Sequence, residues 1–293
     1  MEKTAAVYLV LLGATFMSFN GVLIRLVDNA NGFQILFYRS IALSLLVLVV
    51  IKFKRKILLR YILNNIDKWD LLIGACLGVA FSSYVFSIIY TSVAATLFIL
   101  STTPLIAALL SWIVLNEKPT FVVSIAMVTS LVGVTVMVYE GLSLDRNLGN
   151  GLALLSALFF AVMLVVTRRS YKLDVLTGTC LGGFFSGVFG CLASIFLTSG
   201  LYVSQYDLII MFVMGAFAIG IGISLVTIAA PFIPSSEVSV LVLLESVLGP
   251  IWVWTFLNES MSGSELAGGF IILLSVAILS YRQGSKKIRI KQT

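Results

Sequence analysis

Ten apolar stretches follow one another along the 293-residue chain, each close to the ~20 residues that a helix needs to cross a bilayer. Charged and turn-forming residues separate them and leave no room for a soluble domain. Only 11% of the residues are charged, against about 25% in soluble domains, so the chain could not cover a soluble fold with a wetted surface. We expect an all-α integral membrane protein with ten transmembrane helices, near residues 5–24, 33–51, 69–89, 93–115, 120–139, 148–167, 175–198, 207–229, 235–256 and 264–281.

The distribution of positive charge predicts the orientation of this bundle. All but three of the 19 Lys and Arg residues fall on the side that holds both termini. The exceptions are Arg25 and Arg146 on the other side and Arg39 within the second stretch. Because positive loops stay in the cytoplasm, we expect both termini to be cytoplasmic, in a cell membrane of the bacterial inner-membrane type. Topology and contact with anionic lipids then explain the net charge of +6 without a nucleic-acid partner.

The residue types that are missing exclude most catalytic chemistry. The chain has no His, and its three Cys lie in apolar runs, where we expect them to act as small packing residues. No group of ligands for a metal site is present, and we expect neither a metal nor a cofactor. Every Lys lies outside the apolar stretches, which excludes a retinal Schiff base, and no nucleotide-binding motif is found. We therefore expect a protein that is not an enzyme and is not driven by ATP.

A short internal repeat divides the chain into two halves. Leu-Asn-Glu occurs at residues 115–117 and again at 257–259, each time at the end of the fourth apolar stretch of a half. We expect one five-helix repeat over 1–142 and a second over 143–293. Because five is odd, the second repeat must enter the membrane with the opposite polarity. Inverted repeats are typical of secondary transporters, whose substrate site lies near the midplane between the repeats.

The motifs of the fourth and ninth stretches resemble a known family. Residues 101–105, Ser-Thr-Thr-Pro-Leu, followed by residues 115–118, Leu-Asn-Glu-Lys, are similar to the fourth helix of EamA-type members of the drug/metabolite transporter superfamily. Residues 244–246 and 249–254 are similar to the ninth helix, although Ser246 stands where many members carry proline. Arg39 matches an arginine common in the second helix. The resemblance implies ten helices, alternating access and transport of small organic molecules, often export of amino acids or other metabolites in exchange for protons.

Two charged residues lie within the expected spans. Arg39 is about 9 Å and Glu245 about 15 Å from the nearer end of its helix, where each costs ~2.5–3.5 kcal/mol to insert. We expect both to face the interior of the bundle. One interpretation is a structural bridge between the halves, either between the two residues or from each to backbone carbonyls. The other makes Arg39 a clamp for an anionic substrate group and Glu245 a proton or amine site, since burial disfavours the charged carboxylate.

Polar and aromatic residues in the spans are candidates for the wall of a substrate site. Ser83 and Tyr84 belong to a polar stripe on one face of the third stretch, and Thr102 to a stripe on the fourth. Trp252 lies seven residues after Glu245, which places it on the same side of the helix, and Asn20 lies in the first stretch. A mostly apolar wall with a few polar groups suits a small-molecule site. The alternative for each residue is ordinary packing between helices.

These observations favour a proton-coupled exporter of amino acids or related carboxylates, because guanidinium binds carboxylates in a bidentate manner. The alternative substrates are lipophilic cations, bound by Glu245 and aromatic rings. A non-transporting membrane scaffold is a further alternative. The expected partners are a small-molecule substrate, the proton as coupling ion and the lipid bilayer, with the chain as a monomer or homodimer.

Overall fold

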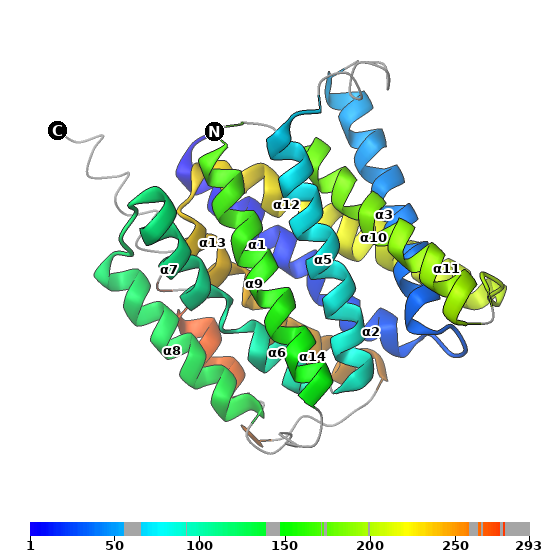
Figure 1. Ribbon diagram of the computed structural model, residues 1–293. Helices are drawn as coiled ribbons and strands as arrows, with labels where there is room; N and C mark the ends of the chain where they lie inside the picture. Colours follow the sequence, from blue (N-terminus) through cyan, green and yellow to red (C-terminus); the bar gives the residue numbers. More distant parts are fainter. Residues whose placement is uncertain are drawn as a thin grey trace.

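The computed structural model describes residues 1–55, 66–91, 93–138, 147–170, 172, 175–198, 200–257, 263–264, 266–275 and 278, and within these ranges the only regular structure is helical. Figure 1 shows the arrangement of the helices. They are α1 (Lys3–Ser18), α2 (Asn20–Arg25), α3 (Gly32–Arg55), α5 (Lys68–Tyr90), α6 (Val93–Leu100), α7 (Thr103–Leu115), α8 (Phe121–Val138), α9 (Asn147–Arg169), α10 (Leu176–Leu197), α11 (Gln205–Val213), the π-helix η1 (Met214–Ile221), α12 (Gly222–Ala229), the 3-10 helix η2 (Ala230–Phe232), α13 (Ser235–Val242) and α14 (Leu244–Leu257).

The expected all-α membrane fold is confirmed, whereas the number of spans is confirmed only in part. Seven helical stretches of the described chain are long and apolar enough to cross a membrane. The expected spans near 93–115, 120–139 and 264–281 contain shorter apolar helices, Thr103–Leu115, Phe121–Gly133 and Leu266–Ser275. The boundary expected at residues 142 and 143, and the end of the second Leu-Asn-Glu motif, lie outside the described residues.

The fourth expected span is interrupted between α6 and α7. Pro104 has no N–H, so the helix loses a backbone bond there. Hydroxyl groups bind the carbonyls just before the break: Thr102 donates to the Ile99 carbonyl at 2.7 Å and Thr103 to the Leu100 carbonyl at 2.5 Å. The two hydroxyl groups therefore satisfy carbonyl groups that the break would otherwise leave without a partner inside the bundle.

The ninth expected span is interrupted at the corresponding place, between α13 and α14. Leu243 separates the two helices, and its N–H bonds to the Val240 carbonyl three residues back. The N–H of Ser246 in turn bonds to the Leu243 carbonyl. The helix is thus interrupted here although Ser246 replaces the proline that many members of the resembling family carry.

Contacts between the two halves give the directions of the helices. Helix α5 runs antiparallel to α9 and parallel to α10, α3 runs antiparallel to α10 and parallel to η1, and α1 runs antiparallel to α12. It follows that α1 and α9, the first helices of the two halves, run in opposite directions. The contacts are Asp70 with Lys172 and Thr91 with Gly149; Gly74 with Gly178 and Gly78 with Gly182; Ser40 with Gly183 and Phe37 with Gly190; Arg39 with Gly215 and Leu43 with Gly220; and Met17 with Gly222 and Gly13 with Val226.

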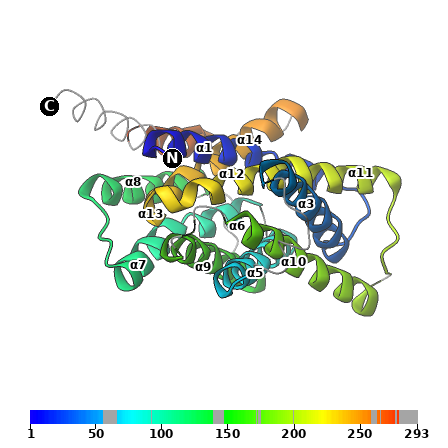
Figure 2. The same ribbon diagram turned by 90° about the horizontal axis from the view of Figure 1, so that it is seen from above.

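The bundle has two layers, seen in Figure 2. One layer contains α1, α12 and α14, and the other contains α5, α7 and α9. In each layer the first helix of one half packs against helices from the third and fourth spans of the other half. The same packing is therefore repeated with the halves exchanged, as a two-fold relation requires.

A seam of glycines brings α5 and α10 into close contact. A Cβ added at Gly182 would lie 2.5 Å from the Cβ of Leu77, and one added at Gly74 would lie 2.6 Å from the Cβ of Leu181. Small residues at a spacing of four let helix backbones approach closely in membranes. The seam holds the third span of one half against the second span of the other.

Candidate functional site

A cavity of about 100 Å³ lies between the two layers, beside the interruptions of the fourth and ninth spans. A water molecule needs ~10–15 Å³ by this measure, so several waters would fit. Most of the wall is apolar, and the polar groups come from both halves. The lining residues are Met17, Asn20, Arg39, Ala80, Phe81, Tyr84, Leu97, Leu100, Thr103, Ser156, Phe160, Ile219, Ser239, Val242, Leu243, Glu245 and Ser246.

Arg39 of α3 contributes a buried guanidinium that is only partly satisfied. Its side chain lies over the Phe81 ring, and its Nη2 donates to the Phe81 carbonyl at 3.1 Å. Its Nη1 is buried and has no hydrogen-bond partner among the described residues. The backbone of Arg39 packs on Gly215, where a Cβ would collide with the Arg39 carbonyl. Gly215 lies in the π-helical segment η1, and such segments occur frequently at functional sites.

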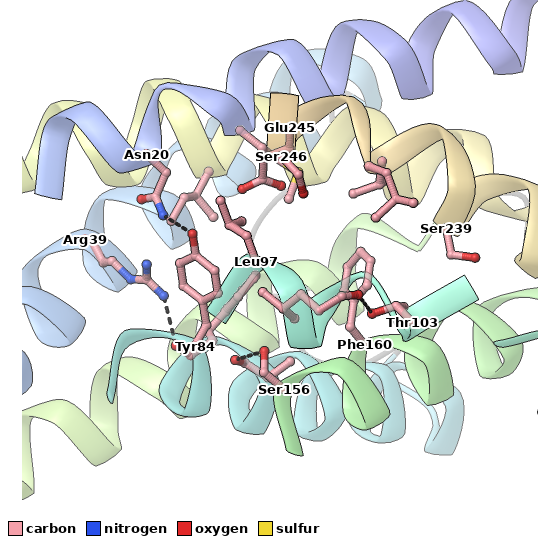
Figure 3. A pocket seen from close by; sticks show the side chains of 17 residues that line it. Asn20, Arg39, Tyr84, Leu97, Thr103, Ser156, Phe160, Ser239, Glu245 and Ser246 are labelled. Carbon is pink, nitrogen blue, oxygen red and sulfur yellow. Dashed lines mark hydrogen bonds between the residues drawn. The ribbon is translucent and has the colours of Figure 1, made fainter. Parts of the chain in front are cut away.

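Tyr84 and Asn20 lie beside Arg39 at the same end of the cavity (Figure 3). The Asn20 amide donates to the Tyr84 hydroxyl at 3.2 Å, while the Asn20 Oδ1 has no partner in the described structure. Asn20 is 2% exposed, and an unsatisfied buried polar atom costs roughly 1–3 kcal/mol. This end of the cavity therefore offers an unused donor on Arg39 and an unused acceptor on Asn20.

Glu245 reaches the cavity from the first turn of α14, in the layer that also contains α1 (Figure 3). It follows the interruption at Leu243, so the break places its carboxyl group beside the cavity. No ion pair joins Glu245 to Arg39 within the described ranges. The direct bridge between these two residues, one form of the structural interpretation, is therefore not formed. The guanidinium is instead held by a backbone carbonyl.

Four of the seven predicted site residues line the cavity: Asn20, Arg39, Tyr84 and Glu245. The other three lie elsewhere, and their assignment as substrate contacts stays a prediction. Ser83 lines a second hollow between α5 and α10. Thr102 bonds to the carbonyl of Ile99 at the α6–α7 break. The indole N–H of Trp252 donates to the Ser18 hydroxyl at 2.7 Å.

Sequence reasoning missed several lining residues, among them Phe160, Ser156, Ser239 and Thr103. Ser156 donates to the Ala80 carbonyl at 2.9 Å and so joins α9 to α5 beside the cavity. The spacing of Ser156 and Phe160, four residues apart, was the available signal. It is weak because the neighbours of both residues along α9 are apolar, so the sequence does not reveal which face points inward.

Four ion pairs among the described residues join the halves at one face of the bundle. Two involve Lys172, whose amino group lies 2.8 Å from Asp67 and 2.6 Å from Asp70. Burial opposes the charge of Lys172, but the bonds to these carboxylates outweigh it and raise the pKa of Lys172. Burial also disfavours the charge of Asp67, yet the hydrogen bond from Lys172 lowers the pKa of Asp67. The other two pairs are Lys3–Glu237 at 2.7 Å and Arg168–Glu117 at 3.2 Å.

Comparison with known proteins gives one family and one fold. The model of the EamA-like transporter family matches residues 4–139 and 147–281. Twenty-eight chains of solved structures match. One, titled only "Crystal structure of protein", has a TM-score of 0.82 at 14% identity, over 96% of this chain and 99% of that chain. At this identity the likeness carries the fold alone. No curated protein matches the chain.

Proposed function

Since the chain belongs to the EamA-like transporter family, we propose that it is a proton-coupled exporter of amino acids or related carboxylates that works by alternating access. Family membership confirms the resemblance indicated by the sequence motifs and establishes a multi-pass membrane transporter. We further propose that the chain has ten spans in two inverted repeats, 1–142 and 143–293. We also propose that it lies in a cell membrane of the bacterial inner-membrane type, with both termini in the cytoplasm.

The paired interruptions support a transport site at the cavity. Discontinuous helices at corresponding positions of two repeats are typical of transporter binding sites, because the broken backbone offers polar groups inside the membrane. Here the breaks at Thr102 and Leu243 occupy equivalent places in the two halves, and residues on both sides of each break line the cavity. A movement of one layer against the other would change access to this cavity.

The unsatisfied guanidinium of Arg39 is the observation that carries the substrate proposal. A buried cation without a paired carboxylate is costly, and its free Nη1 is buried beside the cavity. A carboxylate ligand would satisfy this donor with a charge-assisted hydrogen bond. The unused Oδ1 of Asn20 and the carboxyl group of Glu245 would accept hydrogen bonds from an amino group. An amino acid with an apolar side chain matches both the polar end and the apolar wall.

Glu245 is the proposed proton carrier. It has no ion-pair partner in the described structure, so its charge would be balanced by a proton or by the ammonium group of a substrate. Binding of a proton on one side of the membrane and of the substrate on the other would couple proton entry to substrate exit.

A second candidate substrate class is lipophilic cations. Glu245 supplies a negative charge, and the rings of Phe81, Tyr84 and Phe160 line the same cavity, where they would attract a cation through their faces. Arg39 argues against this class because its own positive charge would repel such a ligand.

Three ligands of one shape separate the candidates: L-leucine, 4-methylpentanoate without the amino group, and 3-methylbutylamine without the carboxylate. A ligand stabilises the state that binds it, by about 2.7 kcal/mol at one hundred times its Kd. We expect thermal stabilisation by L-leucine or 4-methylpentanoate and its loss in Arg39→Met. Stabilisation by the amine alone would favour lipophilic cations. If proteoliposomes under a pH gradient transport no member of a panel of amino acids, carboxylates and lipophilic amines, the scaffold alternative is favoured.

Proton coupling is tested by Glu245→Gln, with Glu237→Gln as the matched control. Glu237 lies in α13 of the same interrupted span but pairs with Lys3 at the face of the bundle. We expect Glu245→Gln to exchange substrate without a response to a pH gradient, and Glu237→Gln to keep the response. Transport by Glu245→Gln that still follows the gradient would refute the coupling role.

A further inference from the structure

The first helix is interrupted one residue before Asn20 enters the cavity. Phe19 separates α1 from α2, and its N–H bonds to the Phe16 carbonyl three residues back at 3.3 Å. The position of the Asn20 side chain therefore depends on the geometry of this interruption at Ser18 and Phe19, which we call the bend. Neither proline nor a steric requirement for glycine accounts for the bend, since Gly21 has open space where a Cβ would be.

Trp252 of α14 contacts the two residues that form the bend. Its indole N–H donates to the Ser18 hydroxyl at 2.7 Å, and the Ser18 hydroxyl itself donates to the Thr15 carbonyl at 2.6 Å. The Trp252 ring stacks on Phe19, with ring centres 4.7 Å apart and planes 11° from parallel. The Trp252 side chain therefore contacts both residues, Ser18 through a hydrogen bond and Phe19 through ring stacking.

Helix α14 connects this contact to the carboxyl group of the other half. Glu245 lies in its first turn, and Trp252 follows seven residues later, about 10 Å along the helix axis. Asn20 lies at the start of α2, one residue after Phe19. One helix, α14, therefore carries Glu245 and also contacts the segment that carries Asn20.

We propose that Trp252 is a positioning residue, which fixes the bend at Ser18 and Phe19 and thereby holds Asn20 at a fixed position relative to Glu245 at the cavity. The inference rests on the proposed function for its significance, because Asn20 and Glu245 are the proposed contacts for the amino group of a substrate. It assigns Trp252 a different role from direct substrate contact, in keeping with its absence from the residues that line the cavity.

The first test needs no ligand. Trp252→Phe keeps an aromatic ring against Phe19 but loses the N–H, and Ser18→Ala removes the acceptor if the tryptophan variant does not fold. Loss of one hydrogen bond should speed amide hydrogen exchange at residues 16–25 by roughly two- to tenfold, with α9 unchanged. Trp254→Phe is the matched control, because Trp254 lies on the same helix and is 54% exposed. Unchanged exchange at the bend, or equal acceleration throughout the protein, would overturn the proposal.

The second test asks whether Trp252 acts through Asn20. With L-leucine as the probe, we expect Trp252→Phe to weaken binding by roughly two- to tenfold and to add less than twofold in an Asn20→Ala background, since coupled residues are not additive. An equal loss in both backgrounds would overturn the positioning role. If the native protein binds neither L-leucine nor 4-methylpentanoate, the proposed substrate class fails, while the exchange experiment still decides the role of Trp252 at the bend.

Discussion

Replacement of Gly182 by alanine tests the seam between α5 and α10. The new Cβ would lie 2.5 Å from the Cβ of Leu77. Neither atom can rotate away, because a Cβ is fixed to its backbone. Carbon atoms pack best at ~3.5–4.0 Å, so the helices must separate by about 1 Å at this point. A gap of that size forfeits a quarter to a half of the local dispersion contacts.

The expected magnitude follows from two opposing effects. Alanine in place of a helical glycine stabilises by ~0.5–1 kcal/mol through the unfolded chain, whereas overpacking costs ~1–3 kcal/mol. We expect a net loss of about 1–2 kcal/mol, or roughly 2–8 °C in Tm, measured by thermal unfolding in detergent. Tyr84 lies on α5, so the same variant should also weaken binding of L-leucine.

Gly151→Ala is the matched control, since a Cβ at Gly151 of α9 meets nothing within 4 Å. It should leave Tm unchanged or raise it. Gly74→Ala repeats the test from the other helix, with a contact of 2.6 Å to the Cβ of Leu181. A Gly182→Ala protein as stable as the Gly151→Ala protein would show that the seam can open without cost, and the packing argument would be wrong.

Three further results are expected. Arg168→Met removes the bonds from Arg168 to Glu117 and to the Pro231 carbonyl and should lower the free energy of unfolding by about 1–3 kcal/mol. Glu117→Gln should lower it less in the Arg168→Met protein than in the native protein. A double-mutant cycle on unfolding measures this difference. Lys172 stabilises the fold below its usual pKa of 10.5 and loses this effect as pH rises through its raised value, while Asp67 stabilises above 3.8 and loses its effect as pH falls through its lowered value. Lys172→Met leaves the buried Asp70 carboxylate without its charged partner, so it should lower Tm at pH 7 by the equivalent of about 1–3 kcal/mol and flatten the acid side of the Tm-against-pH curve; an unchanged acid side would contradict the pairing. Arg39→Lys keeps the charge but not the bidentate geometry, so we expect L-leucine affinity to fall at least about tenfold, and equal affinity would remove the argument for a guanidinium clamp.

Much of the fold could be predicted because the membrane acts on the chain one segment at a time. An apolar run of sufficient length becomes a helix wherever it occurs, since its backbone must satisfy its own hydrogen bonds in lipid. The sequence alone also singled out Arg39 and Glu245 as site candidates. A charge within an apolar run is costly to insert whatever surrounds it. Both reach the cavity.

Which faces meet inside the bundle depended on the tertiary structure. In α9, apolar residues surround Ser156 and Phe160, so the sequence does not show that these two residues face inward. The sequence placed Trp252 on the side of Glu245, but only the packing of α14 on α1 brought it to Ser18. Likewise, two opposite charges in one membrane invite a bridge, and only the structure places the Arg39 guanidinium on the Phe81 carbonyl and away from Glu245. Whether a segment inserts into the membrane as a helix depends on that segment alone. Which side chains touch one another depends on neighbours that are distant in sequence.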